Sequence, residues 1–380
     1  MKRLSMLERR RVLDLIDRSD VSDILHSALK GERVELNDCI NLIRSDNSYA
    51  IGLVGGVLRE KIFGSVTTFI NNIILNYTNV CVTFCKFCAF YRPPGDDEAY
   101  TLPILDIVKR VATSKQLYDI KQVLIQGGHN PDLGIEYYEE AFREMKKKCP
   151  DVAIHGLSAS EVDMIAKVER SSTLEVLSRL KDAGLDSLPG AGAEILDNQV
   201  KYEISPLKIK SEEWLRIMHE AHTLGIRSSA TMMYGTVESE EQQARHLMKI
   251  ASLQDQTHGF MAFIPWSFEP NKTEMQSEGL VRYPSGGLQL LKMIAISRIV
   301  YYQLIDHLQS SWLTNGIGMA QLALTYGADD FGGTLIGEEV VSATGARSTE
   351  LSTTNIVSAI EQIGFDACER DNAYNIIRRY

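Results

Sequence analysis

Three of the six cysteines lie within eight residues, at Cys81, Cys85 and Cys88, in the spacing Cys-x3-Cys-x2-Cys. A disulfide framework would distribute its cysteines differently, and single cysteines are more often small buried apolar residues. The spacing therefore indicates a set of metal ligands on one loop. The remaining cysteines stand alone at positions 39, 149 and 368.

Three thiolates can bind three irons of a 4Fe-4S cubane and leave the fourth iron without a protein ligand. Such an iron can chelate the methionine part of S-adenosylmethionine (SAM), so that one electron breaks the sulfonium bond and releases a 5′-deoxyadenosyl radical. The cofactor then carries the difficult chemistry, and the protein positions the hydrogen to be taken. Structural zinc, the alternative, prefers four protein ligands, and an electron-carrying ferredoxin would also need a fourth cysteine. We therefore predict a 4Fe-4S cluster and SAM as cofactors.

From about residue 68 the sequence repeats a short apolar strand, a Gly- or Ser-rich turn and an amphipathic helix. Strands that alternate with helices pair in parallel through right-handed crossovers, and seven or eight such units favour closure. The sequence therefore predicts an α/β fold, a (β/α) barrel of the TIM type, with its chemistry at the carboxyl ends of the strands. After a first strand before Cys81, the strand candidates are 123–126, 153–157, 185–188, 228–233, 259–264, 307–312 and 329–333.

The helices and the ends of the chain complete this framework. Residues 173–183 predict a helix between a cap at Ser172 and a stop at Gly184, with Leu174 on its inner face together with two further leucines. Residues 1–65 are expected to form an N-terminal helical cap, 66–334 the barrel, and 335–380 a C-terminal helical tail packed on the barrel.

Composition excludes several classes of partner. The formal net charge of -10 disfavours nucleic acid, because the basic run at 146–148 is typical of a solvated helix face. No stretch approaches eighteen uninterrupted apolar residues, so no membrane span is expected. The N-terminus lacks the apolar region of a secretory signal, which favours the cytoplasm. A homodimer is left open.

Polar and glycine-rich segments follow the predicted strands where a barrel places its chemistry. Gly127 and Gly128 expose backbone groups after the second strand. After the third, Ser158 and Glu161 suit a ribose or an ammonium group, although a helix N-cap is an equal alternative for Ser158 or Ser160. Glu194 follows a Gly-rich turn after the fourth strand and is a candidate partner for ribose hydroxyls. We therefore expect these segments to bind a cofactor.

The cysteine stretch at 76–91 resembles the radical SAM superfamily, in which the residue before the third cysteine is usually aromatic and close to the adenine. Phe87 has that place here. The resemblance implies that the Gly127-Gly128 turn binds the methionine amino group, with an ordinary strand-to-helix turn as the alternative. It also implies that Met233 or Tyr234 lies against adenine, with core packing as the alternative.

Within that superfamily, eight strings resemble the cyclic dehypoxanthine futalosine synthases of the futalosine route to menaquinone. That family closes a ring: the radical takes a hydrogen from the ribose of dehypoxanthine futalosine, and the sugar radical adds to the attached benzoate. The sibling aminofutalosine synthase and deazaflavin-forming synthase share the cysteine loop and the barrel. The string at 129–132 favours the cyclase, because the siblings place Leu-His-Pro there. The eight strings are NYTNVC, FCAFYR, VLIQGGHNPDL, GAEIL, ATMMYG, FIPWSF, QSSW and DDFGGT.

Several residues are implied by this resemblance as contacts to the substrate, dehypoxanthine futalosine. Arg92 suits a carboxylate because guanidinium binds it bidentately, with a surface pair to Asp96 or Asp97 as the alternative. His129 is also a candidate to take a proton after ring closure. The electron would come from an unidentified donor such as ferredoxin or flavodoxin. The other implied contacts are Asn130, Thr231, Gln309 and Ser310. Trp266 and Trp312, at predicted strand ends, suit a flat aromatic ligand.

Overall fold

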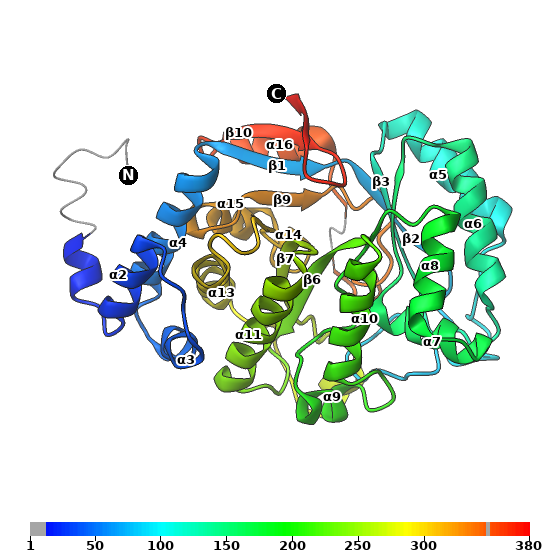
Figure 1. Cartoon of the computed structure of the whole chain (residues 1–380), viewed down its shortest axis with the longest axis horizontal. Coiled ribbons are helices and arrows are strands. Elements are labelled where there is room, and N and C mark those ends of the chain that lie inside the picture. The colour runs from blue at the N-terminus through cyan, green and yellow to red at the C-terminus, as the bar shows by residue number, and fades with distance from the viewer. Residues whose placement is uncertain (1–12, 347–349) are drawn as a thin grey trace.

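The computed structural model describes residues 13–346 and 350–380 and shows a ring of parallel strands surrounded by helices (Figure 1). One sheet has the strand order β2-β3-β4-β5-β6-β7-β8, with every neighbouring pair parallel. This sheet confirms the predicted α/β class and the order of its strands. Its strands are β2 (Asn72–Asn76), β3 (Gln122–Gln126), β4 (Ala153–Gly156), β5 (Ser187–Leu188), β6 (Arg227–Tyr234), β7 (Phe260–Ser267) and β8 (His307–Leu308).

A second sheet, ordered β11-β10-β1-β9, closes the ring. β1 leads into β2 after a single residue and pairs in parallel with β9. The Ser310 N–H donates to the Asp330 carbonyl at 2.9 Å and joins β8 to β9, and the Ile74 N–H donates to the Ile336 carbonyl at 2.9 Å. These backbone bonds make the two sheets one continuous ring. Its strands are β1 (Val66–Ile70), β9 (Asp330–Gly333), β10 (Asp366–Arg370) and β11 (Ile376–Arg379).

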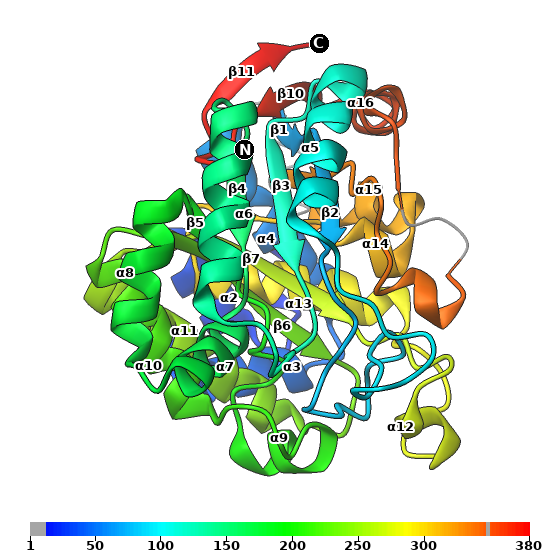
Figure 2. The ribbon, with the colours of Figure 1, turned by 90° about the vertical axis from the view of Figure 1, so that its right-hand side faces the viewer.

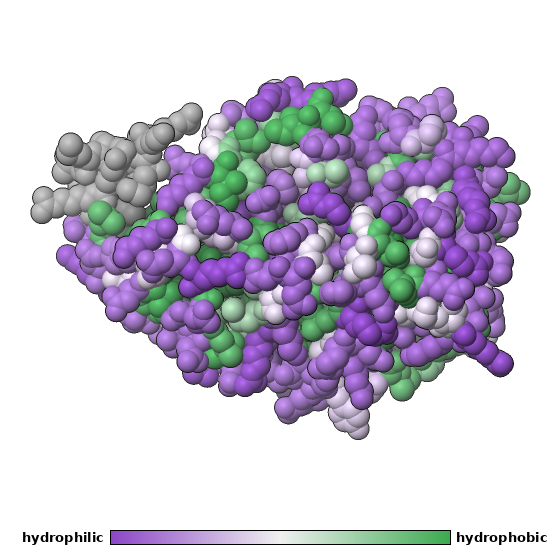
Figure 3. Space-filling view, in the orientation of Figure 1, coloured by the Kyte–Doolittle hydropathy of each residue, from purple (hydrophilic) through white to green (hydrophobic). Residues whose placement is uncertain are grey.

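Helices cover the outside of the ring, as Figures 1 and 2 show. The longer ones are α5 (Ile104–Tyr118), α6 (Ile135–Lys148), α7 (Ala159–Glu169), α8 (Thr173–Ala183), α10 (Ser211–Thr223), α11 (Glu240–Thr257), α13 (Gly287–Val300) and α15 (Ile317–Tyr326). The short ones are α9 (Asn198–Ile204), α12 (Glu274–Ser277) and α14 (Trp312–Asn315). In the parts of the chain that the structure describes, none of the helices is long and apolar enough to span a membrane. Figure 3 shows a mainly polar surface with scattered apolar side chains.

Helix α8 has the predicted caps, with Ser172 accepting the Glu175 N–H and Gly184 in the left-handed conformation. Its inner face differs from the prediction at one position. Leu174 is 43% exposed, because the buried stripe runs through Thr173, Val176, Leu177 and Leu180 at three- and four-residue spacing. Leu174 lies just outside that stripe.

The described part of the predicted N-terminal cap is helical and packs on one side of the barrel, while residues 1–12 lie outside the described residues. Helix α4 approaches α15 so closely that a Cβ at Gly55 would lie 2.3 Å from the Tyr326 carbonyl oxygen. Glycine at this position therefore permits the close packing. The helices of this region are α2 (Ser22–Lys30), α3 (Leu36–Arg44) and α4 (Ser48–Phe63).

The C-terminal segment departs from the helical tail expected for residues 335–380. It contains the short 3-10 helix η1 (Ser342–Thr344) and α16 (Thr353–Glu361), and then the strands β10 and β11. The strands form because β10 finds a free parallel edge on β1, so tertiary pairing overrides the local helical pattern. The boundaries at 65 and 334 stay predictions.

A candidate active site inside the barrel

A cavity of about 390 Å³ opens inside the barrel and is bounded by the loops that follow the strands. The cysteine loop, residues 81–88, forms one part of its wall, and inward side chains of β2, β3, β6 and β7 face it. This is the arrangement expected for the carboxyl ends of parallel strands. The predicted residues that line the cavity are Cys81, Cys85, Phe87, Cys88, Gly127, Gly128, His129, Ser158, Glu161, Glu194, Thr231, Trp266, Gln309 and Trp312.

The cysteine loop is held by its own backbone hydrogen bonds to distant segments. The Cys81 N–H donates to the Arg92 carbonyl at 2.9 Å, and the Lys86 N–H donates to the Ile204 carbonyl at 2.9 Å. The Thr83 hydroxyl lies 3.0 Å from the Cys81 sulfur and 3.6 Å from the Cys85 sulfur. All three predicted thiols therefore face one cavity from a backbone that is fixed on both sides.

The Gly-Gly turn packs directly on this loop. A Cβ at Gly128 would lie 2.1 Å from the Val80 carbonyl oxygen, and the Gly128 N–H donates to the Thr78 carbonyl at 2.9 Å. The Gly127 N–H is taken by the Glu161 carboxylate at 2.9 Å. Glycine is therefore required here for close approach to the cysteine loop, and both amide groups already have protein partners.

Glu161 ties three elements together beside the cavity. Besides Gly127, its carboxylate accepts the Tyr77 hydroxyl at 2.9 Å and the Ser158 N–H at 2.6 Å. The Ser158 hydroxyl in turn accepts the Glu161 N–H at 3.2 Å, so the pair forms the capping box at the start of α7. Burial raises the pKa of Glu161, against the effect of these donors. The capping alternative for Ser158 is thus the one that the structure contains, although its side chain also lines the cavity.

Two buried lysines that the sequence analysis did not single out stand next to the predicted Glu194. The Glu194 carboxylate pairs with Lys208 at 2.8 Å and with Lys201 at 3.2 Å. Burial acts to raise the pKa of Glu194, but the two ammonium groups outweigh it and lower this pKa to about 2. Lys208 also lines the cavity and lies 5.5 Å from the centre of the Phe87 ring. A lysine in a short helix or in a loop carries no local sign of burial, which is why the sequence pattern missed both.

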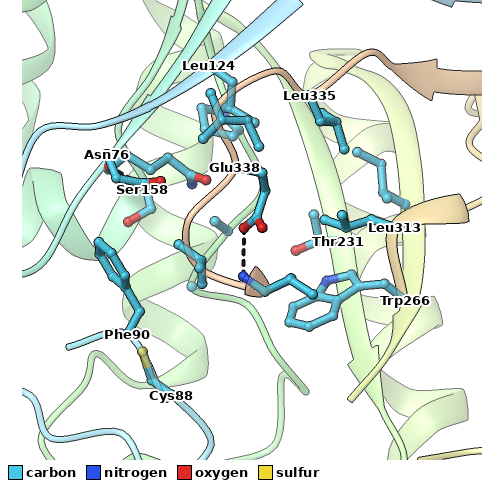
Figure 4. Close-up of a pocket in the computed structure, with 18 of the residues that line it drawn as sticks. Asn76, Cys88, Phe90, Leu124, Ser158, Thr231, Trp266, Leu313, Leu335 and Glu338 are labelled. Carbon is cyan, nitrogen blue, oxygen red and sulfur yellow. Dashed lines mark hydrogen bonds between the residues drawn. The ribbon is translucent and has the colours of Figure 1, made fainter. Parts of the chain in front are cut away.

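Thr231 and Trp266 stand on the side of the cavity opposite Ser158 and Phe90, with Glu338 between the two sides (Figure 4). The Thr231 hydroxyl donates to the Gly190 carbonyl at 2.7 Å. Glu338 belongs to the segment after β9, accepts the Val341 N–H at 2.6 Å, and is buried, which raises its pKa. It lies in the predicted tail, where no motif indicated a site.

The comparisons with known proteins agree with this geometry. Residues 75–250 match a sequence model of the radical SAM superfamily, and residues 257–379 match the CofH/MqnC C-terminal region. The cyclic dehypoxanthine futalosine synthases of Streptomyces coelicolor and Halalkalibacterium halodurans are each 39% identical to the chain over 95% of its length, and the matches cover 90% and 96% of those proteins. The chain belongs to this family.

Sibling enzymes are similar to the chain as well. The 5-amino-6-(D-ribitylamino)uracil--L-tyrosine 4-hydroxyphenyl transferase of Methanopyrus kandleri is 34% identical over 97% of the chain and 100% of that protein. Among solved structures, methylornithine synthase has a TM-score of 0.69 at 16% identity, covering 90% of this chain and 96% of its own. The [FeFe]-hydrogenase maturase HydG has a TM-score of 0.73 at 14% identity, covering 96% of this chain and 80% of its own. These structures support the radical SAM fold of the enzyme.

The residues present fit a 4Fe-4S cluster, which the superfamily uses together with SAM. Three thiols line one cavity, and the cation of Lys208 lies near enough to favour the thiolate of Cys85 against burial, which raises the pKa of that thiol to about 12. Within the described ranges, no three His, Cys, Asp or Glu side chains converge on a site for one metal ion. In a cubane each thiolate binds a different iron, so the three ligands need not converge on one point. The absence of a converging group in the described ranges therefore concerns sites for a single ion and not a cluster.

Two predicted substrate contacts lie outside the cavity lining, in the loops around the cysteines. Arg92 pairs with Glu98 at 2.6 Å, rather than with either predicted aspartate, and its Nη1 donates to the Tyr91 carbonyl at 2.9 Å. The Asn130 amide donates to the Thr101 hydroxyl at 3.1 Å and accepts the Asp132 N–H at 3.0 Å. Both side chains therefore brace loops in the structure, and their contact with substrate stays a prediction.

Two further predicted residues are placed differently for a similar reason. Met233 is fully buried in the core and does not line the cavity, so the core alternative holds for it and for Tyr234. Ser310 is also fully buried, and its hydroxyl donates to the Phe331 carbonyl at 3.1 Å, where β8 meets β9. The predicted strand 307–312 ends early, because Ser311 adopts a left-handed conformation and Trp312 begins α14.

Proposed function

We propose that the enzyme converts dehypoxanthine futalosine into cyclic dehypoxanthine futalosine, a step of the futalosine route to menaquinone. The observation that carries this proposal is the 39% identity to two cyclic dehypoxanthine futalosine synthases over 95% of the chain. Three cysteines on one wall of a cavity inside the barrel support it, because a radical reaction needs its substrate held beside the cofactor.

In this proposal Cys81, Cys85 and Cys88 hold the 4Fe-4S cluster, and SAM binds beside it. When bound, these cofactors supply a 5′-deoxyadenosyl radical that takes a hydrogen from the substrate. Glu161 holds the Gly127 N–H at 2.9 Å and so keeps the Gly-Gly turn against the cysteine loop. Lys208 places a cation beside the thiolates and balances part of the negative charge of the loaded site.

The part of the cavity around Trp266, here called its far part, suits an aromatic substrate that must be kept from water. Trp266 offers a flat face, and apolar side chains of several strands surround it. Burial lowers the pKa of His129 to about 3, so its imidazole stays neutral near pH 7. We therefore assign His129 a hydrogen bond to substrate rather than the role of a strong base. The apolar lining residues are Ile74, Leu124, Ile264, Leu313, Phe331, Leu335, Val340 and Val341.

A second candidate follows from the siblings, since the 4-hydroxyphenyl transferase of Methanocaldococcus jannaschii is also 39% identical, over 84% of the chain. That candidate would join a tyrosine-derived radical to a ribitylaminouracil. Both candidates use the same cofactors and differ in what the far part of the cavity receives.

The deciding experiment incubates anaerobically reconstituted, reduced enzyme and SAM with each substrate in turn. Dehypoxanthine futalosine is expected to lose two hydrogens by mass spectrometry, with the new ring visible by NMR. Unchanged dehypoxanthine futalosine beside turnover of tyrosine with the ribitylaminouracil would overturn the cyclase assignment.

We further propose that the enzyme works in the cytoplasm and takes electrons from a ferredoxin or flavodoxin. Size-exclusion chromatography would distinguish a monomer from a homodimer.

A further inference from the structure

The loop between β10 and β11, residues 371–375 and here called the tail loop, lies at the end of the barrel away from α9 and α12 (Figures 1 and 2). Asp371 closes the loop by accepting the Ala373 N–H at 2.8 Å and the Asn375 N–H at 2.9 Å. With its turn closed in this way, the loop presents Asn372 and Tyr374 to the strands of the ring.

Asn372 bridges two strands of the ring. The Gln122 side chain, at the start of β3, donates to the Asn372 amide oxygen at 2.6 Å, and the Asn372 amide nitrogen donates to the Ser187 hydroxyl, in β5, at 3.0 Å. A single residue of the tail thus holds two strands whose own pairing with each other is interrupted by β4.

Tyr374 reaches the other side of the ring. Its ring stacks on His307, at the start of β8, with centroids 4.0 Å apart and an interplanar angle of 13°. Its hydroxyl accepts the Gln309 amide at 3.4 Å, and Gln309 lines the cavity. Arg370, which precedes the loop, lies 3.7 Å from the Tyr374 ring centre and pairs with Asp330 at 2.5 Å. The tail loop is therefore fixed against both halves of the barrel.

Through Ser187 the tail loop also reaches His155, which lies between β3 and β5 in the sheet and lines the cavity. The Ser187 hydroxyl is 2.7 Å from His155 Nδ1. In the described parts of the chain, the side-chain hydrogen bond of this ring is the one between Nδ1 and Ser187. His155 is 8% exposed, so its ring is oriented from one side and offers its remaining nitrogen on the other.

We propose that the tail loop supports the floor of the cavity, where His155 and Gln309 line it, and orients His155 to accept a hydrogen bond from a hydroxyl group of the substrate. The inference rests on the proposed function, whose substrate carries a sugar. A neutral imidazole has one N–H. The Ser187 hydroxyl can donate to the Asn372 amide oxygen at 3.2 Å, so it is free to accept Nδ1–H of His155, and the lone pair of Nε2 then remains as an acceptor. Burial lowers the pKa of His155 to about 3, which keeps that lone pair free near pH 7. In this scheme Asn372, Ser187 and Tyr374 are positioning residues.

Two substitutions of His155 test the contact itself. An asparagine amide reaches about as far as Nδ1 and a glutamine amide about as far as Nε2, so His155→Asn keeps the Ser187 bond and His155→Gln keeps the group facing the cavity. We expect His155→Asn to raise the dissociation constant of dehypoxanthine futalosine about tenfold, and His155→Gln to raise it clearly less. Calorimetry on the unreduced holoenzyme measures both. Equal binding by the two variants and the unchanged enzyme would overturn the proposal.

Two substitutions of the tail loop test the floor. Asn372→Ala and Tyr374→Phe are expected to raise the same dissociation constant about threefold to tenfold and to increase the 5′-deoxyadenosine formed per cyclised product, at unchanged iron content. Tyr380→Phe is the matched control, because it removes a tyrosine hydroxyl from the same tail, where it bonds to Glu369 away from the cavity. If both variants have the dissociation constant and the ratio of 5′-deoxyadenosine to cyclised product of the control, the proposed role of the tail loop is wrong.

A second measurement separates this inference from the proposed function. If the unchanged enzyme does not bind dehypoxanthine futalosine, the function fails, and the floor is judged without substrate by hydrogen exchange. Amides at 153–157 and 307–310 are expected to exchange faster in Asn372→Ala and Tyr374→Phe than in Tyr380→Phe. Identical exchange in all three variants would overturn the floor whatever the substrate is.

Discussion

The two ends of the barrel are built on different principles. At the cysteine-loop end three closely spaced thiols, those of Cys81, Cys85 and Cys88, line one cavity. At the tail end two buried ion pairs lie at the start of β9. Arg298 pairs with Asp329 and Arg370 pairs with Asp330, both at 2.5 Å. Closely spaced thiols gather where a ligand can bind them, whereas the opposite end pairs its own charged groups. Substitutions at the first end should therefore change chemistry, and substitutions of the buried ion pairs at the second end should change stability.

The largest effect is expected at the cysteine loop. Cys85→Ala removes one of three proposed cluster ligands, so we expect loss of the cluster and a fall in activity of about a thousandfold or more. Iron content and SAM-dependent 5′-deoxyadenosine formation measure it. Cys149→Ala is the control, since Cys149 is a buried cysteine at the end of α6, away from the cavity lining. Equal iron content in both variants would show that Cys85 is not a ligand of the cluster.

A smaller loss is expected from Gly128→Ala. The added Cβ would meet the Val80 carbonyl oxygen at 2.1 Å, so either the Gly-Gly turn or the cysteine loop must move. We expect activity to fall about a hundredfold, because displacements of about 1 Å at a reacting centre have effects of that size. Gly286→Ala is the control, because a Cβ there meets nothing within 4 Å. A fully active Gly128→Ala enzyme would show that close approach at the cysteine-loop end is dispensable.

At the tail end Asp329→Asn should destabilise the fold and leave the chemistry of folded molecules nearly intact. Arg298 would keep its buried charge without a partner, which costs about 3 to 5 kcal/mol in the free energy of unfolding. Urea denaturation at neutral pH measures this loss. Asp119→Asn, which breaks an exposed pair with Lys115, is the control and should cost about 1 kcal/mol or less.

The same pair sets a pH dependence. Burial acts to raise the pKa of Asp329, but His307 and Arg298 outweigh it and lower that pKa below the usual 3.8. The carboxylate therefore contributes stability above pH 3.8, and this contribution is lost as the pH falls through the lowered pKa. The stability difference between the unchanged enzyme and Asp329→Asn should shrink over that interval, and a constant difference would contradict the assignment.

The smallest effect is expected from Met233→Leu. Met233 is fully buried in the core, and a swap of similar volume costs less than about 1.5 kcal/mol. The KM for SAM should stay within about twofold of the original value. A larger rise in this KM would place Met233 against the adenine after all and would extend the chemical end of the barrel deeper into the core.

Much of the site follows from local patterns in the sequence. The three cysteines, the Gly127-Gly128 turn and the position of Glu194 were recognisable because spacing and strand order place them at one end of a parallel sheet. Arg92 and Asn130 were expected in the cavity for their chemistry and instead brace loops. A guanidinium or an amide serves either purpose, and only its neighbours in space decide which.

The sequence by itself determined the ligand set and the order of strands, because both depend on short-range spacing and periodicity. Only the tertiary structure decided that Lys208 stands beside the cysteines, that Glu338 of the C-terminal segment enters the cavity, and that Asn372 reaches Ser187. Asn372 and Ser187 are 185 residues apart in the chain. Contacts of that kind arise from the closure of the ring and from the free edge of β1, which no local pattern records.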